Sequence, residues 1–87
     1  MKTTHYIDQW REVKAMTDGK TMDEIRNIFG EGVTNDFVED GVRIIDTNYK
    51  DILVTLSNED GKVRLADSFE CYDKDGVFIG VLYASEF

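Results

Sequence analysis

Three Asp-Gly pairs divide the last two-thirds of the chain, and they constrain the fold more than any other feature. The pairs are Asp40-Gly41, Asp60-Gly61 and Asp75-Gly76. Asp-Gly tolerates the positive φ that tight hairpin turns require. A weaker fourth turn is expected from Asn48 to Lys50. The pattern predicts successive hairpins, which together form an antiparallel meander.

Five strands are expected between and around these turns. Their predicted ranges are Val33–Val38, Val42–Thr47, Ile52–Ser57, Lys62–Tyr72 (bulged) and Val77–Ala84. Period-two alternation of apolar residues predicts which side of each strand faces the core. The core-facing sets are Ile52, Val54 and Leu56, then Val63 and Leu65, and then Val77, Ile79, Val81 and Tyr83.

The first 30 residues have helical rather than strand-like spacing. A first helix is expected over Thr4–Met16, capped by Thr3 or Thr4. Its apolar stripe consists of Tyr6, Ile7, Trp10 and Val13. The pair Asp18-Gly19 ends this helix.

A second helix is marked by a capping box. Thr21 stands three residues before Glu24, so each side chain satisfies a backbone N–H of the first turn. Met22, Ile25 and Phe29 form its apolar face, with Ile28 adjacent, and Gly30 fits the position that ends a helix.

These elements predict an α+β fold, with two N-terminal helices packed on one face of a four- to five-stranded antiparallel meander sheet. The 87 residues suffice for one domain, with a helical pair over 1–30 and the sheet over 31–87. No apolar run has the length of a membrane span or a secretory signal. A single cysteine excludes an internal disulfide, and a cytoplasmic location is expected.

The second face of the sheet is predicted to carry an apolar and aromatic patch. Tyr49, Leu53, Phe78 and Leu82 have the opposite parity to the core sets, and Tyr72 or Phe69 joins them. Exposed patches of this kind often mark partner sites. Two alternatives are that the sheet curls over the patch, or that Ser85–Phe87 covers it.

The net charge of -8 comes entirely from the second part of the chain. Residues 1–30 hold five acids and five bases, whereas residues 31–87 hold 13 acids and five bases. Such a field repels nucleic acids and membrane surfaces and attracts basic proteins. The alternative is that the acidity serves solubility alone.

The segment from Gly19 to Gly30 resembles the helical signature of the β-lactamase-inhibitor-protein-like domains and the related small outer-membrane lipoproteins. Asp60-Gly61-Lys62-Val63 resembles their DGKV hairpin. The resemblance implies a helix pair on one face of a four-stranded antiparallel sheet whose open face and loops bind protein partners. The chain departs from the family in having no lipoprotein signal, no disulfide pair and no second tandem copy.

Residues suited to catalysis or metal binding do not form a pattern. His5 is the only histidine, and Cys71 lies beside Glu70, which opposes thiolate formation. The segments 58–61 and 73–76 lack the register of calcium loops and are better explained as hairpin turns. We therefore expect no catalytic residues, no metal and no cofactor.

The sequence thus favours a non-enzymatic acidic protein-binding module. The leading hypothesis is an inhibitor of the phage or mobile-element type, similar to anti-CRISPR proteins, which acts on a host protein with a basic, nucleic-acid-binding surface. In some such inhibitors, acids take the place of phosphates. The expected partner-binding residues are Glu39, Asp40, Asp46, Asp51, Asp60, Asp67, Glu70, Asp73, Asp75, Tyr49, Tyr72 and Phe78.

Two other functions stay open at this point. One is an envelope or assembly factor that binds protein through the open sheet face. The other is a small enzyme or ligand carrier, which requires a deep pocket with converging carboxylates. The chain is expected to be a monomer or a homodimer formed through the edge strand Val77–Ala84, because unpaired edges associate readily.

Overall fold

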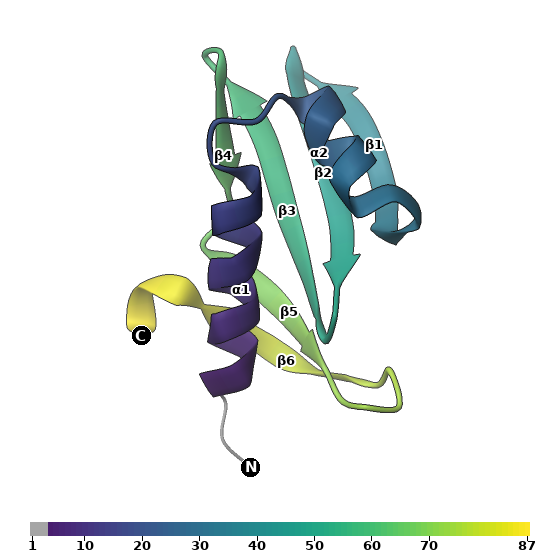
Figure 1. Ribbon diagram of the computed structural model, residues 1–87, viewed down its shortest axis with the longest axis vertical. Coiled ribbons are helices and arrows are strands. Elements are labelled where there is room, and N and C mark those ends of the chain that lie inside the picture. Colours follow the sequence, from purple (N-terminus) through teal and green to yellow (C-terminus); the bar gives the residue numbers. More distant parts are fainter. Residues whose placement is uncertain (1–3) are drawn as a thin grey trace.

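A computed structural model describes residues 4–87 of the chain (Figure 1). The helices are α1 (Thr4–Thr17) and α2 (Met22–Phe29), with short 3-10 helices η1 (Gly30–Gly32) and η2 (Ala84–Glu86). The strands are β1 (Val33–Glu39), β2 (Val42–Tyr49), β3 (Ile52–Glu59), β4 (Lys62–Leu65), β5 (Ser68–Tyr72) and β6 (Phe78–Tyr83). The predicted α+β fold, with the helices preceding an antiparallel sheet, is confirmed.

The six strands form one sheet in the order β1-β2-β3-β5-β6, and β4 also pairs with β3. The predicted single strand Lys62–Tyr72 is therefore two strands that lie in succession along β3, which explains the additional strand. The interruption falls at Ala66, whose N–H donates to the carbonyl of Thr55 at 2.9 Å. The carbonyl of Ala66 accepts a hydrogen bond from the indole N–H of Trp10 at 3.0 Å. A side chain of α1 therefore provides a hydrogen-bond partner for the backbone at the interruption.

Two of the three Asp-Gly pairs form two-residue hairpin turns with positive φ at both positions. Asp40 and Gly41 have φ of 51° and 79°, and Asp60 and Gly61 have 53° and 74°. These values match a type I′ turn. The third pair lies in a longer loop, in which the N–H of Asp73 donates to the carbonyl of Val77. The fourth turn lies at 50–51, slightly later than predicted.

Both helices begin and end close to their predicted positions. Helix α1 extends to Thr17, one residue beyond the prediction, and its cap at Thr3 or Thr4 falls outside the described residues and side chains. At the start of α2, the N–H of Glu24 donates to the Thr21 hydroxyl at 3.1 Å. In return, the N–H of Thr21 donates to the Glu24 carboxylate at 3.0 Å. The predicted capping box is therefore present.

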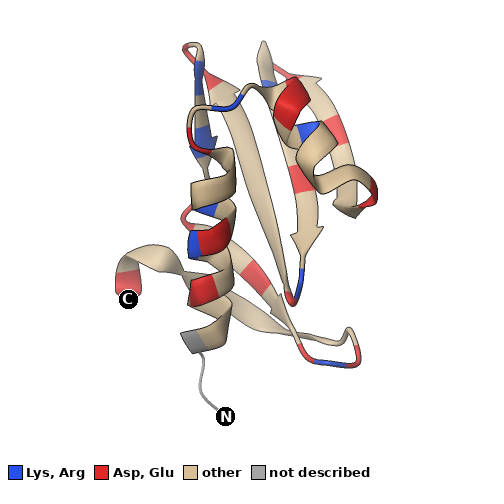
Figure 2. Cartoon of the chain, viewed as in Figure 1, with Lys and Arg blue, Asp and Glu red and all other residues tan. Residues whose placement is uncertain are grey.

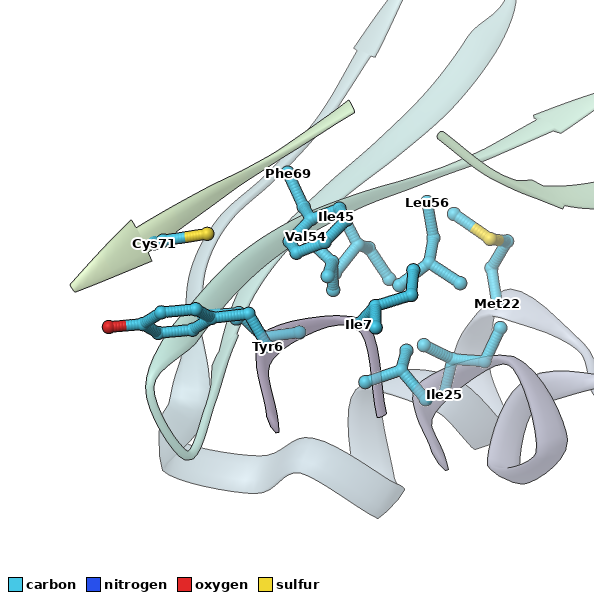
Figure 3. Packing of buried hydrophobic residues seen from close by; sticks show 11 residues of the cluster. Tyr6, Ile7, Met22, Ile25, Ile45, Val54, Leu56, Phe69 and Cys71 are labelled. Atoms are coloured by element: carbon cyan, nitrogen blue, oxygen red, sulfur yellow. The ribbon is translucent and has the colours of Figure 1, made fainter. Parts of the chain in front are cut away.

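The core lies between the two helices and one face of the sheet (Figure 3). Tyr6 and Ile7 of α1 and Met22 and Ile25 of α2 point toward the strands. The strands contribute Ile45, Ile52, Val54, Leu56, Phe69 and Cys71, each no more than 2% exposed. The alternation predicted for Ile52–Leu56 is confirmed, and it explains why both helices cover this face.

Helix α1 is fixed to the sheet by hydrogen bonds as well as by apolar packing. The Tyr6 hydroxyl donates to the carbonyl of Tyr72 at 3.1 Å. The Gln9 side chain donates to the Asp51 carboxylate at 3.1 Å and accepts from the Asp51 N–H at 3.0 Å. With the Trp10 bond at Ala66, these contacts connect one helix to three separate positions along the sheet.

Strand register decides which side chains face away from the helices. Directly opposed residues share a face, and Phe69 lies opposite Leu82 while Tyr49 lies opposite Ile52. Tyr49, Phe69 and Leu82 therefore lie on the helix side, and their predicted place on the open face is wrong. Leu53 and Tyr72 do lie on the open face.

The predicted core set of the last strand is also wrong. Val77, Ile79, Val81 and Tyr83 are 57%, 50%, 45% and 49% exposed. A one-residue irregularity explains the error: Cys71 lies opposite Gly80, whereas the next residue, Tyr72, lies opposite Phe78. The extra residue, Ile79, shifts the alternation so that Phe78 and Val81 share the open face.

Candidate functional site

The strongest candidate for a partner site is the part of the open sheet face formed by β5, β6 and the start of β3. We call it the β5–β6 face, and it consists of Leu53, Glu70, Tyr72, Phe78, Val81 and Tyr83. Three of these residues are large, apolar and roughly half exposed: Phe78 at 53%, Val81 at 45% and Tyr83 at 49%. Apolar side chains gathered in this way on a sheet characterise interaction surfaces.

An aromatic pair and a carboxylate form the centre of this face. The rings of Tyr72 and Phe78 meet edge to face, with their centroids 5.8 Å apart. The Tyr72 hydroxyl donates to the Glu70 carboxylate at 2.6 Å, and this bond raises the pKa of Tyr72. In the sheet, Glu70 lies opposite Leu53 on one side and Val81 on the other. A negative charge is thus held among apolar neighbours.

The loop between β5 and β6 adds further acids at the end of the face. The Asp73 carboxylate accepts the backbone N–H groups of Asp75 and Val77 at 2.8 and 2.9 Å. These bonds fix the loop. Asp75 at the tip is exposed. Asp51 adjoins this loop, because its carbonyl accepts the N–H of Tyr72 at 2.9 Å.

The structure brings half of the predicted partner-binding residues together at this end of the sheet. This group consists of Asp51, Glu70, Tyr72, Asp73, Asp75 and Phe78. Glu39, Asp40 and Asp60 lie at the opposite end, in and beside the β1–β2 and β3–β4 turns (Figure 1). The structure therefore does not bring the twelve predicted residues into one site.

Three predicted residues belong to neither end. Asp46 lies on the open face, where it accepts hydrogen bonds from Thr55 at 2.6 Å and Asn35 at 3.1 Å. Asp67 accepts the N–H and the hydroxyl of Ser85 at 2.8 and 2.9 Å. Tyr49 lies beneath the helices, where its hydroxyl donates to Glu12 at 2.6 Å. Each of these side chains has a structural role inside the molecule.

Acids also occur outside the predicted site, so the negative charge is distributed over several elements (Figure 2). Asp36 is neutralised by two arginines: Arg43 at 2.8 Å and Arg26 at 2.6 Å. Arg43 also pairs with Asp23 at 2.6 Å. Hydrogen bonding by Arg43, reinforced by Arg26, lowers the pKa of Asp36 to about 2. The acids of the sheet therefore divide into paired structural ones and those at the two ends.

The C-terminal segment leaves the β5–β6 face open. Ser85 is hydrogen-bonded to Asp67, Ala84 packs against the core, and Phe87 is itself 48% exposed. Phe78 and Val81 keep their exposure with this segment in place. The alternative in which Ser85–Phe87 covers the patch is therefore wrong.

Sequence reasoning missed Val81 and Tyr83 because strict alternation placed them in the core. The run Val77-Phe78-Ile79, followed by Gly80, contained the signal for the irregularity. Three consecutive apolar residues do not alternate, and a glycine inside a strand often marks a bulge.

Features that favour catalysis are weak in the described part of the chain. Burial raises the pKa of the Cys71 thiol, which disfavours the thiolate. The carboxyl groups with a displaced pKa, Glu12, Glu24 and Asp36, are all shifted downward, whereas a general acid needs an upward shift. A hollow of about 470 Å³ in the described part of the chain is lined by residues 19–22, Asn58 and residues 61–63, none of which is an acid. Among residues 4–87, no cluster of three or more potential metal ligands occurs.

Neither helix of residues 4–87 has the length and apolar character needed to cross a bilayer. No family model, curated protein or solved structure matches this chain at a significant level.

Proposed function

We propose that this chain is a non-catalytic protein-binding module whose β5–β6 face docks on a basic protein surface. The observation that carries the proposal is the Tyr72–Phe78 pair, in which Phe78 is exposed, with Glu70 beside it and the acids of the 73–76 loop at its edge. An apolar centre with charged surroundings is the usual composition of a protein interface. The net charge of -8 indicates that the surface of the partner is positively charged.

Charge and apolar contact have separate roles in this proposal. Exposed acids increase the rate of encounter with a basic partner and are screened by salt. Buried aromatic side chains supply most of the affinity in protein interfaces. Phe78, 53% exposed in the free chain, is the side chain with the most to gain from burial by a partner.

The partner class is a protein whose working surface is basic, and nucleic-acid-binding enzymes are the main members of that class. Docking on such a surface occludes it, so the chain acts as an inhibitor. This proposal requires no deep pocket and no cofactor, since occlusion needs only a complementary surface.

The test is affinity capture from a bacterial lysate with the immobilised wild-type chain and two matched variants. Phe78→Ala removes the aromatic anchor and is expected to weaken capture of the retained protein about 10-fold or more. Phe37→Ala is the control, because Phe37 is 43% exposed on the same face of the sheet, on the far edge strand. The captured protein is then assayed for nucleic-acid binding with and without the chain.

The role of charge in partner binding is tested by a second pair of variants and by varying the salt concentration. Asp75→Asn is expected to weaken capture, whereas Asp40→Asn, at the other end of the sheet, leaves it unchanged. Capture is expected to decline as NaCl rises from about 50 to about 500 mM, because exposed charges are screened. Equal losses for Phe78→Ala and Phe37→Ala, or capture indifferent to salt, would exclude the β5–β6 face as a docking site for a basic protein.

A further inference from the structure

Strand β6 forms one edge of the sheet, and apart from the irregularity at Ile79 it lacks the protection that edges normally have. Natural sheets usually guard their edges with charges or irregular backbone. Strand β1, at the far edge of the sheet, contains Asp36 and Glu39, and Asp40 follows it. From Val77 to Tyr83 the chain has no charge. The exposed apolar residues of this segment are Val77, Phe78, Ile79, Val81 and Tyr83.

The free backbone groups of β6 point outward at alternate residues. The N–H of Ala84 donates to the carbonyl of Asp67 at 2.9 Å, so Ala84 faces β5. Because hydrogen-bonding direction alternates along an antiparallel strand, Leu82 also faces β5 and Val81 and Tyr83 face outward. Their N–H and C=O groups are therefore directed to receive another strand.

A hollow lies beside this edge at Gly80. It has a volume of about 190 Å³ and is lined by Tyr6, Cys71 and the residues from Ile79 to Leu82. Apart from its two neighbours in the chain, no residue has a heavy atom within 4 Å of the place where a side chain at residue 80 would begin. The strand therefore has a gap at Gly80 and, two residues later on the same face, a large side chain at Leu82.

We propose that a second copy of this chain pairs with β6 in antiparallel fashion, with Val81 of each copy on the two-fold axis. In this register, Leu82 of each copy lies opposite Gly80 of the other, where the hollow receives it. Ile79 lies opposite Tyr83, and aromatic side chains pair favourably with β-branched ones across strands. The contact is self-complementary, as a two-fold interface must be.

Charge determines where a second copy can associate with this chain. Two molecules of charge -8 repel each other, so they associate best where both are uncharged, and β6 is such a place. Lys74 precedes the strand and Glu86 follows it. Asp73 and Asp75 flank Lys74, so both ends of this uncharged stretch are acidic.

Sedimentation velocity of the purified chain from about 5 to about 500 µM tests this proposal. One strand pair is smaller than a standard interface of about 800 Å² per partner, so dissociation in the micromolar range is expected. Added salt is expected to strengthen the dimer by screening the repulsion. This is the opposite of its expected effect on partner capture, and the measurement uses no partner, so failure here is distinguishable from failure of the proposed function.

Charge-swap variants test the register. Val81→Lys and Val81→Asp each place like charges across the axis and are expected to weaken self-association about 10-fold or more. An equimolar mixture of the two is expected to recover the dimer as a heterodimer. Val38→Lys, on the guarded edge strand where Val38 is 68% exposed, is the control and is expected to dimerise like wild type.

Circular dichroism establishes that each variant is folded. Recovery in the mixture is a second safeguard, because two unfolded variants would not restore a dimer. A wild-type chain that stays monomeric up to about 500 µM, or a dimer weakened equally by Val38→Lys and Val81→Lys, would overturn the proposal. A dimer weakened by both Val81 variants but not recovered by mixing them would overturn the proposed register.

Discussion

Several acids of this chain act as hydrogen-bond acceptors between elements rather than as surface charges. Glu12 accepts from Tyr49 and Lys50, Asp46 accepts from Thr55, and Asp36 accepts from Arg43. These bonds connect helix to sheet or strand to strand. Composition alone gives only the net charge, and it does not reveal which carboxylates have such partners.

Asp36 is the clearest case, because two arginines converge on a side chain that is only 16% exposed. Asp36→Asn is expected to lower the free energy of unfolding by about 1–3 kcal/mol at pH 7, since Arg43 loses a charged partner. Glu39→Gln, at the exposed end of the same strand, is the control. Urea unfolding measures both, and equal losses would contradict the structural role of Asp36.

The pH dependence of stability follows from the same residue. The pKa of Asp36 is lowered from 3.8 to about 2 in the folded chain, so ionised Asp36 stabilises the fold at neutral pH. That contribution is complete above the unfolded pKa and is lost as the pH falls through the folded pKa. The stability difference between wild type and Asp36→Asn is therefore expected to shrink between pH 4 and pH 2. A difference that stays constant over this range would contradict the assignment.

At the scale of elements, helix α2 shows how a short sequence signal defines a structure. It has eight residues, a length at which an isolated helix is marginal in water. The capping box between Thr21 and Glu24 and the burial of Met22 and Ile25 stabilise it.

Thr21→Ala removes the hydroxyl that accepts the N–H of Glu24, and it is expected to cost about 1 kcal/mol of stability. Thr21→Ser keeps the hydroxyl and is expected to retain most of that stability. Thermal unfolding of the two variants gives the comparison. If the Ser variant loses as much as the Ala variant, the cap does not stabilise α2.

Much of the fold could be predicted from sequence because local signals agreed with tertiary structure. Asp-Gly pairs located two hairpins, the capping box located α2, and alternation identified Ile52, Val54 and Leu56 as core. The face of β6 could not be predicted in this way. One extra residue at Ile79 reverses the parity of everything after it, and such an irregularity depends on pairing with β5.

The candidate site was predictable only in part, for two physical reasons. Phe78 was placed on the open face by its parity, with Tyr72 or Phe69 beside it, and Phe78 and Tyr72 do lie there. Tyr49 was misplaced because the turn lies at 50–51, so Tyr49 pairs with Ile52 and shares its helix-facing side. Its hydroxyl is bonded there to Glu12, a partner that is distant in sequence. Long-range hydrogen bonds of this type leave no trace in local spacing.

At the scale of the whole molecule, the excess of negative charge opposes folding to a compact state. Some acids are neutralised by bases: Asp36 and Glu12 are examples, and the remaining excess repels itself. Raising NaCl from about 20 to about 300 mM is expected to increase the urea midpoint, because screening relieves the repulsion more than it weakens the few ion pairs. A lower midpoint in salt would show that the ion pairs dominate.

The attachment of α1 to distant strands limits when this helix can dock on the sheet during folding. Its polar contacts reach partners that lie 42, 56 and 66 residues further along the chain. Helix α1 is synthesised before these partners, and the Tyr6 bond cannot close until Tyr72 has emerged from the ribosome. Contacts of high sequence separation slow folding, and α1 can complete its docking only after β5 has been synthesised.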